Sequence, residues 1–371
     1  MKAVIIGGGI SGTVTAMALQ RAGIEASVHE AYPSGGEDAG AFLTIMHNGM
    51  DALRAIGAEA PVIESSFAAV GLELVTPDGR TVERRSFDVD STDGLAGPRT
   101  LTRAALYRAL QEEAISRGIT FERGKRLVSA SPGTARFEDG TSAEGDILIG
   151  ADGLRSVVRN LIDASCPPPR STGLDVVYGY TTDKSVPQAP SLYRMIQSQH
   201  AFFGYTSTPD GSTYWFARLP TAEGVRVGLT PAEWRTTAFA AFDGEPLPAA
   251  EIIGSTGDDV FGGHSYDVPS TPVWWNSSMV LVGDAAHAAS PAAGQGASMA
   301  LEDSVVLAQC LRDLPDAPTA FAVYERLRRA RVEKLVASSA AVSTGTTSDE
   351  GRNWLYQHHI EWDAKIETPR V

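Results

Sequence analysis

Apolar and polar positions near the start of the chain follow each other in the order strand, helix, strand. Residues 3–6 (AVII) are a short β-branched run bounded by glycines, which is typical of a buried parallel strand. Residues 11–22 carry apolar side chains at roughly helical spacing, and Gly23 ends that pattern. Residues 26–30 (ASVHE) then read as a second strand. A strand, a glycine turn, a helix and a strand in this order predict a βαβ unit.

Helical and strand-like patterns continue to alternate after this unit. A long helix is expected over residues 101–117, with Thr102 as its N-cap. A Pro-Asp-Gly turn beginning at Pro77 separates two alternating runs, which predicts an antiparallel hairpin of residues 69–75 and 81–87. The remaining elements expected in this part are a helix over 48–56 and strands over 120–123, 127–130, 134–137 and 146–150.

The pattern changes between about residues 172 and 268, where aromatic side chains alternate along strands and helical spacing becomes rare. Such runs, with a second Pro-Asp-Gly turn at Pro209, predict an antiparallel sheet. Residues 273–282 return to the pattern of the first part of the chain. Helices are then expected over 297–312, 319–344 and, as an amphipathic segment, 353–366.

Together these elements predict an α/β fold with a Rossmann-like domain, an inserted antiparallel β-sheet domain and C-terminal helices. A ligand would lie at the junction of the two domains. The expected ranges are 1–70, 99–171 and 273–345 for the Rossmann-like domain, 71–98 and 172–272 for the inserted domain, and 346–371 for a C-terminal helical segment.

Composition narrows the kinds of partner. The 371 residues include 31 basic and 45 acidic side chains, for a net charge of −14, and this argues against a nucleic acid or an anionic membrane as partner. No window of eighteen apolar residues occurs, so we expect no transmembrane helix and a cytoplasmic protein. Cys166 and Cys310 do not have the spacing of a zinc site, so we expect free thiols and no metal. No obligate protein partner is evident.

The first chemical motif is GGGISG at residues 7–12, which fits GxGxxG through Gly7, Gly9 and Gly12. These glycines permit a tight turn, a close approach of the backbone to a pyrophosphate, and close packing of helix on strand. The phosphates would lie at the helix N-terminus, where free N–H groups favour anions. Glu30 ends the second strand and is expected to bind the ribose hydroxyls of an adenosine.

Two further segments decide which dinucleotide is expected. They are DILIGADGLRSVVR at residues 146–159 and LVGDAAHAASPAAGQGASMALED at residues 281–303. With GGGISG, they occur in the order and spacing of the FAD-dependent aromatic hydroxylases, the single-component group A flavoprotein monooxygenases similar to p-hydroxybenzoate hydroxylase. The chain resembles this family over nearly its whole length.

The resemblance implies that the first domain binds FAD and that the inserted domain binds substrate. Asp284 would lie at the ribityl hydroxyls, and the loop from Pro291 to Ser298 would surround the flavin ring, with a backbone contact at Ser298. Asp152 and Arg159 would contact NAD(P)H, or alternatively form a structural ion pair that braces the loop. The residues expected to bind FAD are Gly7, Gly9, Ile10, Ser11, Gly12, Glu30, Arg103, Asp152, Gly283, Asp284, Pro291, Gly294, Gln295, Gly296, Ala297 and Ser298.

Aromatic residues of the inserted domain alternate along its strands, so one set should line a cavity under the flavin and the other should pack outward. The expected cavity residues are Tyr193, Met195, Phe203, Tyr205, Tyr214 and Phe216. Arg194 and Arg218 lie on the same strands, but no benzoate-type anchor stands out among the surrounding aromatics. In the family's layout His47 falls near the flavin and is a candidate for proton transfer.

The function implied by the resemblance is a monooxygenase. NADH or NADPH would reduce FAD, O₂ would form a flavin C4a-hydroperoxide, and one oxygen atom would enter an aromatic or other electron-rich ring, of indole, phenol or quinone type. The alternatives are a flavin-dependent epoxidase, an N-hydroxylase, a halogenase, an alkene-reducing dehydrogenase and a non-catalytic flavin-binding redox sensor.

Overall fold

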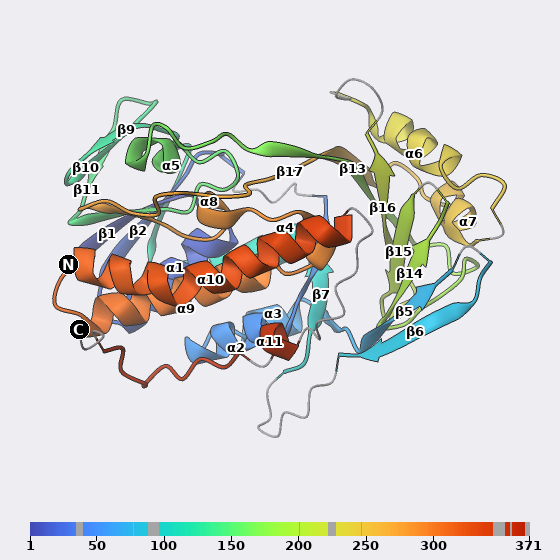
Figure 1. Ribbon diagram of the computed structural model, residues 1–371, viewed down its shortest axis with the longest axis horizontal. Helices are drawn as coiled ribbons and strands as arrows, with labels where there is room; N and C mark the ends of the chain where they lie inside the picture. Colours follow the sequence, from blue (N-terminus) through green and yellow to red (C-terminus); the bar gives the residue numbers. More distant parts are fainter. Residues whose placement is uncertain are drawn as a thin grey trace.

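The computed structural model describes residues 1–34, 40–76, 78–87, 96–199, 201–221, 228–245, 247–343, 353–356 and 358–367. Its two ends differ in construction: helices and a parallel sheet fill the end with the N-terminus, and a second sheet stands at the other end (Figure 1). Strands β13 (Arg170–Thr181) and β17 (Val260–Asp267) belong to the second sheet and extend toward the first.

The first sheet has five parallel strands in the order β18-β12-β1-β2-β8. Helix α1 follows β1 and leads into β2, so the βαβ unit is confirmed. Because neighbouring strands are parallel, the carboxyl ends of β1, β12 and β18 lie side by side, and each is followed by one of the three motifs. The elements are β1 (Lys2–Ile6), α1 (Ile10–Arg21), β2 (Glu25–Glu30), β8 (Thr120–Arg123), β12 (Ile147–Gly150) and β18 (Met279–Leu281).

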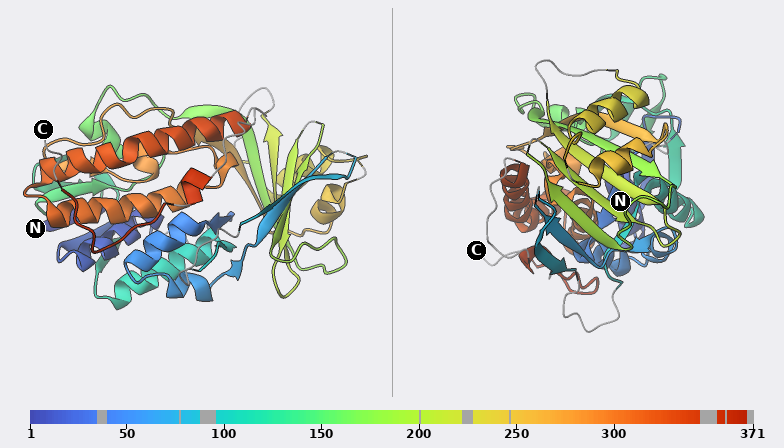
Figure 2. Two further views of the ribbon diagram at one scale, coloured as in Figure 1. Left: turned by 60° about the horizontal axis from the view of Figure 1, so that its bottom comes forward. Right: turned by 90° about the vertical axis from the view of Figure 1, so that its right-hand side faces the viewer.

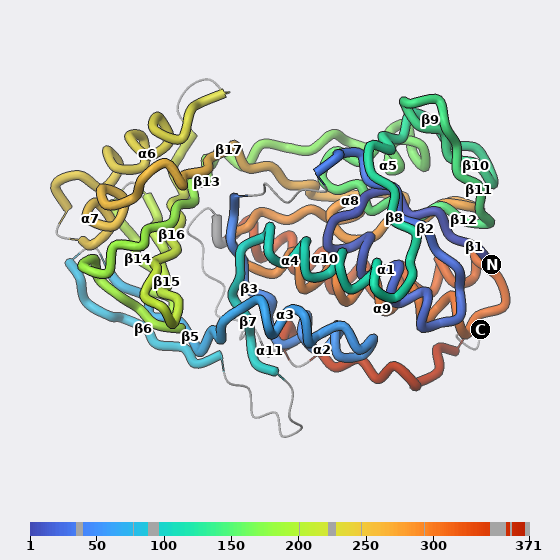
Figure 3. Tube along the Cα trace, turned by 180° about the vertical axis from the view of Figure 1, so that it is seen from behind, coloured from blue at the N-terminus to red at the C-terminus, as the bar shows by residue number. Residues whose placement is uncertain are grey.

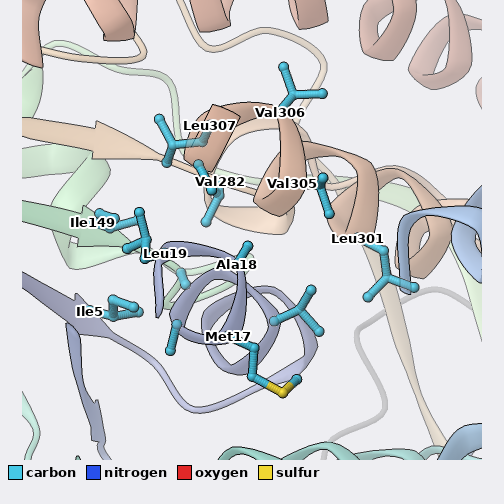
Figure 4. Packing of buried hydrophobic residues seen from close by; sticks show 14 of the residues in the cluster. Ile5, Met17, Ala18, Leu19, Ile149, Val282, Leu301, Val305, Val306 and Leu307 are labelled. Carbon is cyan, nitrogen blue, oxygen red and sulfur yellow. The ribbon is translucent and has the colours of Figure 1, made fainter. Parts of the chain in front are cut away.

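Close packing of helix α9 (Gly296–Asp313) on α1 builds the core above this sheet (Figure 4). Nearly all of α1 from Ile10 to Leu19 is buried, which explains its weak amphipathic pattern. Helix α10 (Ala317–Ser343) packs along α9 on the side that faces the viewer in Figure 1. The side chains that meet in this core include Ile5, Met17, Ala18, Leu19, Ile149, Val282, Leu301, Val305 and Leu307.

The second sheet has seven strands in the order β17-β13-β16-β15-β14-β5-β6. Helices α6 (Pro231–Ala240) and α7 (Ala249–Gly254) cover its outer face, and its inner face is turned toward the rest of the molecule (Figure 2). The other strands are β5 (Gly71–Val75), β6 (Thr81–Ser86), β14 (Leu192–Gln197), β15 (Phe202–Ser207) and β16 (Thr213–Pro220).

A small three-stranded sheet, β3-β7-β4, lies between the two large sheets. Its strand β7 leads directly into helix α4, which lies in front when the molecule is seen from behind (Figure 3). A second small sheet, β11-β10-β9, packs near helix α5. The elements are β3 (Phe42–Ile45), α2 (His47–Ala55), α3 (Ala60–Glu64), β4 (Phe67–Ala68), β7 (Arg99–Thr102), α4 (Arg103–Ser116), β9 (Leu127–Ser131), β10 (Thr134–Phe137), β11 (Ser142–Glu144) and α5 (Val157–Ile162).

Four expectations from the sequence need correction. The long helix begins at Arg103 rather than residue 101, because Leu101 pairs in β7, although Thr102 does cap the helix through Ala105 N–H. The second sheet is not wholly antiparallel, since β5 pairs with β14 in parallel. Helices α6 and α7 were not expected. Of the amphipathic helix expected over 353–366, only α11 (Asn353–Tyr356) is helical, and the described residues 358–367 carry no helix.

The hairpin of β5 and β6 is confirmed, although Pro77 of its turn lies outside the described residues. Among the described residues, no helix is long and apolar enough to cross a membrane, and no cluster of three or more His, Cys, Asp or Glu has the arrangement of a metal site. Cys166 and Cys310 are both buried free thiols, as expected.

Candidate active site

The GGGISG loop makes a turn that only glycine can occupy at two of its positions. Gly7 has a φ of +104°, and a β-carbon there would lie 2.3 Å from the carbonyl oxygen of Ala151. A β-carbon on Gly12 would lie 1.9 Å from the Gly7 carbonyl oxygen. At Gly9 the nearest atom to such a carbon is the Tyr107 hydroxyl, at 3.6 Å. The turn is therefore tight against the strands but leaves room at Gly9 for a ligand to approach the backbone.

Helix α1 begins directly after this turn and offers its first N–H groups to an anion. Its first residues, Ile10 and Ser11, follow a Gly9 N-cap that provides no side-chain hydrogen bond, and its first turn contains no acidic residue. The Glu30 carboxylate stands beside the turn and accepts the N–H groups of Gly8 at 2.7 Å and Tyr32 at 2.8 Å. Glu30 lies at the end of β2, and its binding of ribose hydroxyls remains a prediction.

Gly283 of the Gly-Asp turn lies directly against Ser11 at the start of α1. Gly283 has a φ of +58°, and a β-carbon there would lie 2.1 Å from Ser11 Oγ and 3.1 Å from the β-carbon of Ala300. A dinucleotide turn and a Gly-Asp turn some 270 residues apart thus form one surface. Both turns pack so closely on neighbouring atoms that a side chain at Gly7, Gly12 or Gly283 would clash, and this close packing holds the two turns together.

Asp284 begins the short helix α8 (Asp284–His287), and its carboxylate is partly exposed. A β-carbon on Gly296 would lie 3.9 Å from Asp284 Oδ1, so this carboxylate faces the N-terminus of α9. No hydrogen bond from a described residue reaches the Asp284 carboxylate. It is therefore available to ligand hydroxyls.

The loop before α9 brings backbone N–H groups to the same place. It runs from η1 (Pro291–Ala293) through Gly294, whose φ is +62°, to Gln295. The N–H groups of Gly296, Ala297 and Ser298 donate to no described residue, and the positive end of the α9 dipole adds to their attraction for an anion. The Ser298 hydroxyl accepts the Met46 N–H at 3.1 Å, so its side chain holds α9 against the start of α2.

The Gly-Asp turn is held in place by a network of charged side chains. The network consists of Glu302, Asp303, Arg328, Arg331 and His287. Asp303 accepts from Arg328 Nε at 2.7 Å, from His287 Nε2 and from the Gly283 N–H at 3.0 Å. Glu302 pairs with Arg328 and, at 2.8 Å, with Arg331. Burial alone would raise the pKa of both carboxyls, but these cationic and hydrogen-bonding neighbours outweigh it and lower each pKa to about 2.

Arg103 lies within electrostatic reach of Asp284. Its Nε donates to the Tyr107 hydroxyl at 2.8 Å, and its backbone N–H donates to Ala41. The pKa of Arg103 is raised by Tyr107 and, against the effect of burial, by Asp284. Arg103 is therefore half-buried and held by Tyr107 within electrostatic reach of Asp284.

The structure corrects the expectation that Arg159 contacts NAD(P)H. Arg159 is only 2% exposed, and its guanidinium donates to the carbonyls of Ala285 at 2.8 Å and Leu154 at 2.6 Å. Asp152 accepts the Val157 N–H at 2.7 Å and caps α5 instead of pairing with Arg159. Asp152 thus braces its own loop, and Arg159 ties that loop to the Gly-Asp segment through Ala285, so a direct contact of Arg159 with a docking nucleotide does not fit its burial.

The inner face of the second sheet carries an aromatic cluster that packs against β3. Tyr193, Met195, Tyr214 and Phe216 lie on this face together with Tyr178 and Tyr180, and all pack around Phe42 of β3. Phe203 and Tyr205, also expected in the cavity, point the other way: both are fully buried with Trp215 and Phe242 beneath α6 and α7. Their assignment to the substrate cavity was therefore wrong.

The hydroxyl groups of Thr44 and Thr100, on strands of the small sheet, contact Tyr193 of this cluster. The sequence analysis did not predict these contacts. The Tyr193 hydroxyl lies 2.7 Å from Thr44 Oγ1 and 3.0 Å from Thr100 Oγ1, and the two threonines are 3.0 Å apart. Burial raises the pKa of Tyr193 to about 12, although both hydroxyl contacts oppose this. Nothing in the local sequence signals this triangle, because its members lie on three separate strands.

His47 is buried at the start of α2, next to the contact between Met46 and Ser298. Its Nε2 lies 2.5 Å from the carbonyl oxygen of Phe87, to which it donates. The ring is thus oriented by a backbone group, and its assignment to proton transfer remains a prediction.

Comparisons with known proteins agree with this geometry. The model of the FAD binding domain family matches residues 1–339. The aurachin C monooxygenase/isomerase of Stigmatella aurantiaca is 30% identical over 349 residues, which cover 91% of this chain and 88% of that protein. The 3-amino-4-hydroxybenzoate 2-monooxygenase PtmB3 of Streptomyces platensis is 30% identical over 345 residues, covering 89% and 85%. The crystal structure of Klebsiella pneumoniae HpxO with FAD and uric acid superposes with a TM-score of 0.81 at 25% identity, covering 96% and 92% of the two chains.

Proposed function

Because the chain belongs to the FAD-dependent aromatic hydroxylases and is a flavoprotein monooxygenase, we propose that it uses NADH or NADPH and O₂ to insert one oxygen atom into a small ring compound. One observation carries this proposal. Asp284 lies at the N-terminus of α9, and Arg103 is within electrostatic reach both of Asp284 and of Tyr178 in the aromatic cluster of the second sheet. A cofactor held by Asp284 and the N-terminus of α9 would therefore have its reactive end near an apolar, aromatic surface.

The proposal divides the chain by role. Residues 1–70, 99–171 and 273–345 would hold FAD, and residues 71–98 and 172–272 would supply the substrate surface. The α1 N-terminus and Glu30 would bind the adenosine diphosphate portion, and Arg103 and Asp284 would bind the middle of the cofactor. When bound, FAD supplies the hydride acceptance and the activation of O₂.

The residues of this chain would orient the substrate and exclude water. The α9 N-terminus, with the free N–H groups of Gly296 to Ser298, would stabilise negative charge that develops on the nearby part of the cofactor during reduction. The aromatic cluster around Phe42 would keep the reacting ring in a dry environment. NAD(P)H would reach the cofactor from the junction of the two sheets without contacting Arg159.

The substrate we propose is an aromatic or other electron-rich ring, of the indole, phenol or quinone type. The cluster on the inner face consists of phenol and phenyl side chains, which suit stacking and edge contacts with a planar ring. Two relatives support the class, because one is named for 3-amino-4-hydroxybenzoate and HpxO was crystallised with uric acid.

The proposal is tested with purified protein. We expect a flavin spectrum, reduction of the flavin by NADH or NADPH without air, and faster NAD(P)H oxidation with a ring substrate that gains one oxygen atom. A reduced flavin that stays stable in air would instead favour a redox sensor. A product that depends on chloride would favour a halogenase, and reduction of the substrate without O₂ would favour a dehydrogenase. Oxygen recovered on a nitrogen or as an epoxide would assign one of the neighbouring oxygenation reactions.

A further inference from the structure

Three side chains of the second sheet form a hydrogen-bonded chain that the proposed oxygenation does not use. Ser171 Oγ lies 2.6 Å from His264 Nε2, and His264 Nδ1 lies 3.0 Å from Asp175 Oδ1. Asp175 is fully buried, the side chain of His264 is 5% exposed, and Ser171 is exposed. A hydroxyl, an imidazole and a buried carboxylate are thus connected in this order from the surface to the interior.

This chain of side chains lies on the face of the sheet that is turned away from the aromatic cluster. Asp175 and His264 are cross-strand partners on β13 and β17, so their side chains share one face. Val177, the next residue on the same side of β13, is buried beneath α6 and α7, whereas Tyr178 belongs to the aromatic cluster. The Ser171 site is therefore separate from the surface proposed for the ring substrate.

An irregularity in β13 brings Ser171 to the imidazole. The register in the middle of β13 would, if continued, place Ser171 opposite Val268, beyond the end of β17. The register instead shifts between Ser171 and Asp175, and Ser171 lies opposite Tyr266, which is nearer to His264. Bulges of this kind re-aim side chains and are over-represented next to active sites.

The carboxylate fixes the imidazole in the tautomer that a general base requires. The Asp175 carboxylate accepts and does not donate, so the proton of His264 lies on Nδ1, and Nε2 is free to accept the Ser171 hydroxyl. Thr221 Oγ1 lies 3.3 Å from Asp175 Oδ1, and Asp175 Oδ2 has no hydrogen-bond partner in the described part of the chain. A proton taken up by Nε2 would place a cation beside this buried carboxylate, which stabilises the imidazolium.

The surroundings of Ser171 leave room for an acyl group. Gly173 is exposed and has a φ of +74°, and a β-carbon on it would meet no described atom within 4 Å apart from its chain neighbours. Its N–H donates to Ser171 Oγ at 3.1 Å, so a backbone donor stands beside the place where negative charge would develop on an attacked carbonyl. Because β17 is an edge strand, no further described strand covers the site on that side.

We propose that Ser171 and His264, positioned by Asp175, form a second catalytic site that hydrolyses esters of short carboxylic acids. His264 Nε2 removes the proton from Ser171 Oγ as this oxygen attacks the ester carbonyl carbon. The bond from that carbon to the alcohol oxygen breaks, and His264 returns the proton to the departing alcohol. Water then attacks the acyl-serine in the same way, which releases the carboxylic acid and restores Ser171. The reaction needs neither FAD nor O₂, so it is independent of the proposed oxygenation.

The test is covalent labelling of the FAD-saturated protein with an alkyl fluorophosphonate. Ser171 Oγ would form a bond to phosphorus, fluoride would leave, and the proton would pass to His264. Intact mass and peptide mass spectrometry should show one label, at Ser171, which is absent when the protein is unfolded in urea before labelling. The native protein should also hydrolyse p-nitrophenyl acetate faster than Ser171→Ala does.

Three further variants identify the groups responsible. His264→Gln should slow labelling about a hundredfold or more, which is the usual contribution of a general base. Asp175→Asn should also slow labelling, because an amide can hold the imidazole in the other tautomer. The matched control Ser185→Ala removes an exposed serine whose hydroxyl donates to Asp183 at 2.6 Å, and it should be labelled as fast as wild type.

A network that only fixes the bulge of β13 would give variants with lower melting temperatures and a wild-type Ser171 that takes no label. The inference is overturned if native wild-type protein gains no label at Ser171, if His264→Gln is labelled as fast as wild type, or if Ser171→Ala hydrolyses the ester equally fast. The first result needs no variant, so a variant that fails to fold cannot obscure it. Labelling without NAD(P)H-dependent turnover would contradict only the proposed oxygenation.

Discussion

Arg328→Met is the substitution whose effect the structure defines most sharply. Arg328 lies on α10 with a side chain only 1% exposed, and it pairs with the fully buried carboxylates of Asp303 and Glu302. Methionine keeps most of the apolar stem and removes the charge. Removal of one partner from a buried ion pair costs about 3–5 kcal/mol, because the remaining charges lose their compensation.

The expected shift in melting temperature follows from chain length. Unfolding entropy of about 2 cal/mol/K per residue gives roughly 0.8 kcal/mol per degree for 371 residues, so the variant should melt about 4–6 °C below wild type at pH 7. Scanning calorimetry of FAD-saturated protein measures this shift. FAD should also dissociate more readily, because Asp303 holds the Gly283 N–H. Arg326→Met, an exposed position on the same helix, is the matched control and should change little.

The pH dependence separates lost charge from lost packing. The folded-state pKa of Asp303 and Glu302 is lowered to about 2, so their contribution to stability is present above about pH 4 and is lost as the pH falls toward 2. Without Arg328, burial should raise both pKa values, and protonation then relieves the unpaired charge. The difference between variant and wild type should therefore shrink as the pH is lowered from 7 to 4. A difference of under about 1 kcal/mol at pH 7, or one that does not change with pH, would refute this explanation.

Three further predictions concern the proposed cofactor site and the second sheet. Gly283→Ala places a β-carbon 2.1 Å from Ser11 Oγ at a φ of +58°, so equilibrium dialysis should show FAD affinity at least tenfold weaker; unchanged affinity would mean that the two turns do not share the cofactor. Asp284→Ala removes a carboxylate that lacks a described partner, so we expect weaker FAD binding with a melting temperature of the FAD-free protein near that of wild type. Phe216→Ala should weaken the binding of ring ligands in calorimetric titrations, whereas Phe203→Ala should destabilise the protein by about 3–5 kcal/mol and leave ring binding nearly intact. The opposite pattern would show that the two faces were assigned incorrectly.

The cofactor half of the site could be predicted because its signals are local. A glycine that must adopt a positive φ, an acid at the end of a strand and a Gly-Asp turn after an apolar run are visible in short windows of sequence. The parallel sheet then brings the three motifs to one edge, as Gly7, Asp152 and Gly283 show. The cofactor contacts expected of the glycine turns involve the backbone, whereas the contact expected of Arg159 depends on a side chain that proves to be only 2% exposed.

The substrate half could not be predicted because it depends on which face of each strand is covered. Alternation along β15 and β16 separates Phe203 from Phe216, but only the positions of α6 and α7 determine which set is interior. Helix α6 did carry a signal, the capping box of Thr230 and Glu233, which could have revealed it. Arg328 lies in an arginine-rich stretch that reads as an exposed helix face, and its burial results from the packing of α10 on α9.

The most direct test of the central claim is a turnover measurement with isotopically labelled O₂. Purified protein would be incubated with NADH or NADPH and a panel of phenol, indole and quinone ring compounds, and products would be analysed by mass spectrometry. We predict that a ring product carries one labelled oxygen atom and that its formation follows substrate-stimulated NAD(P)H oxidation. A flavin-loaded protein that consumes NAD(P)H and O₂ without labelling any ring compound, or that binds no flavin, would contradict the account.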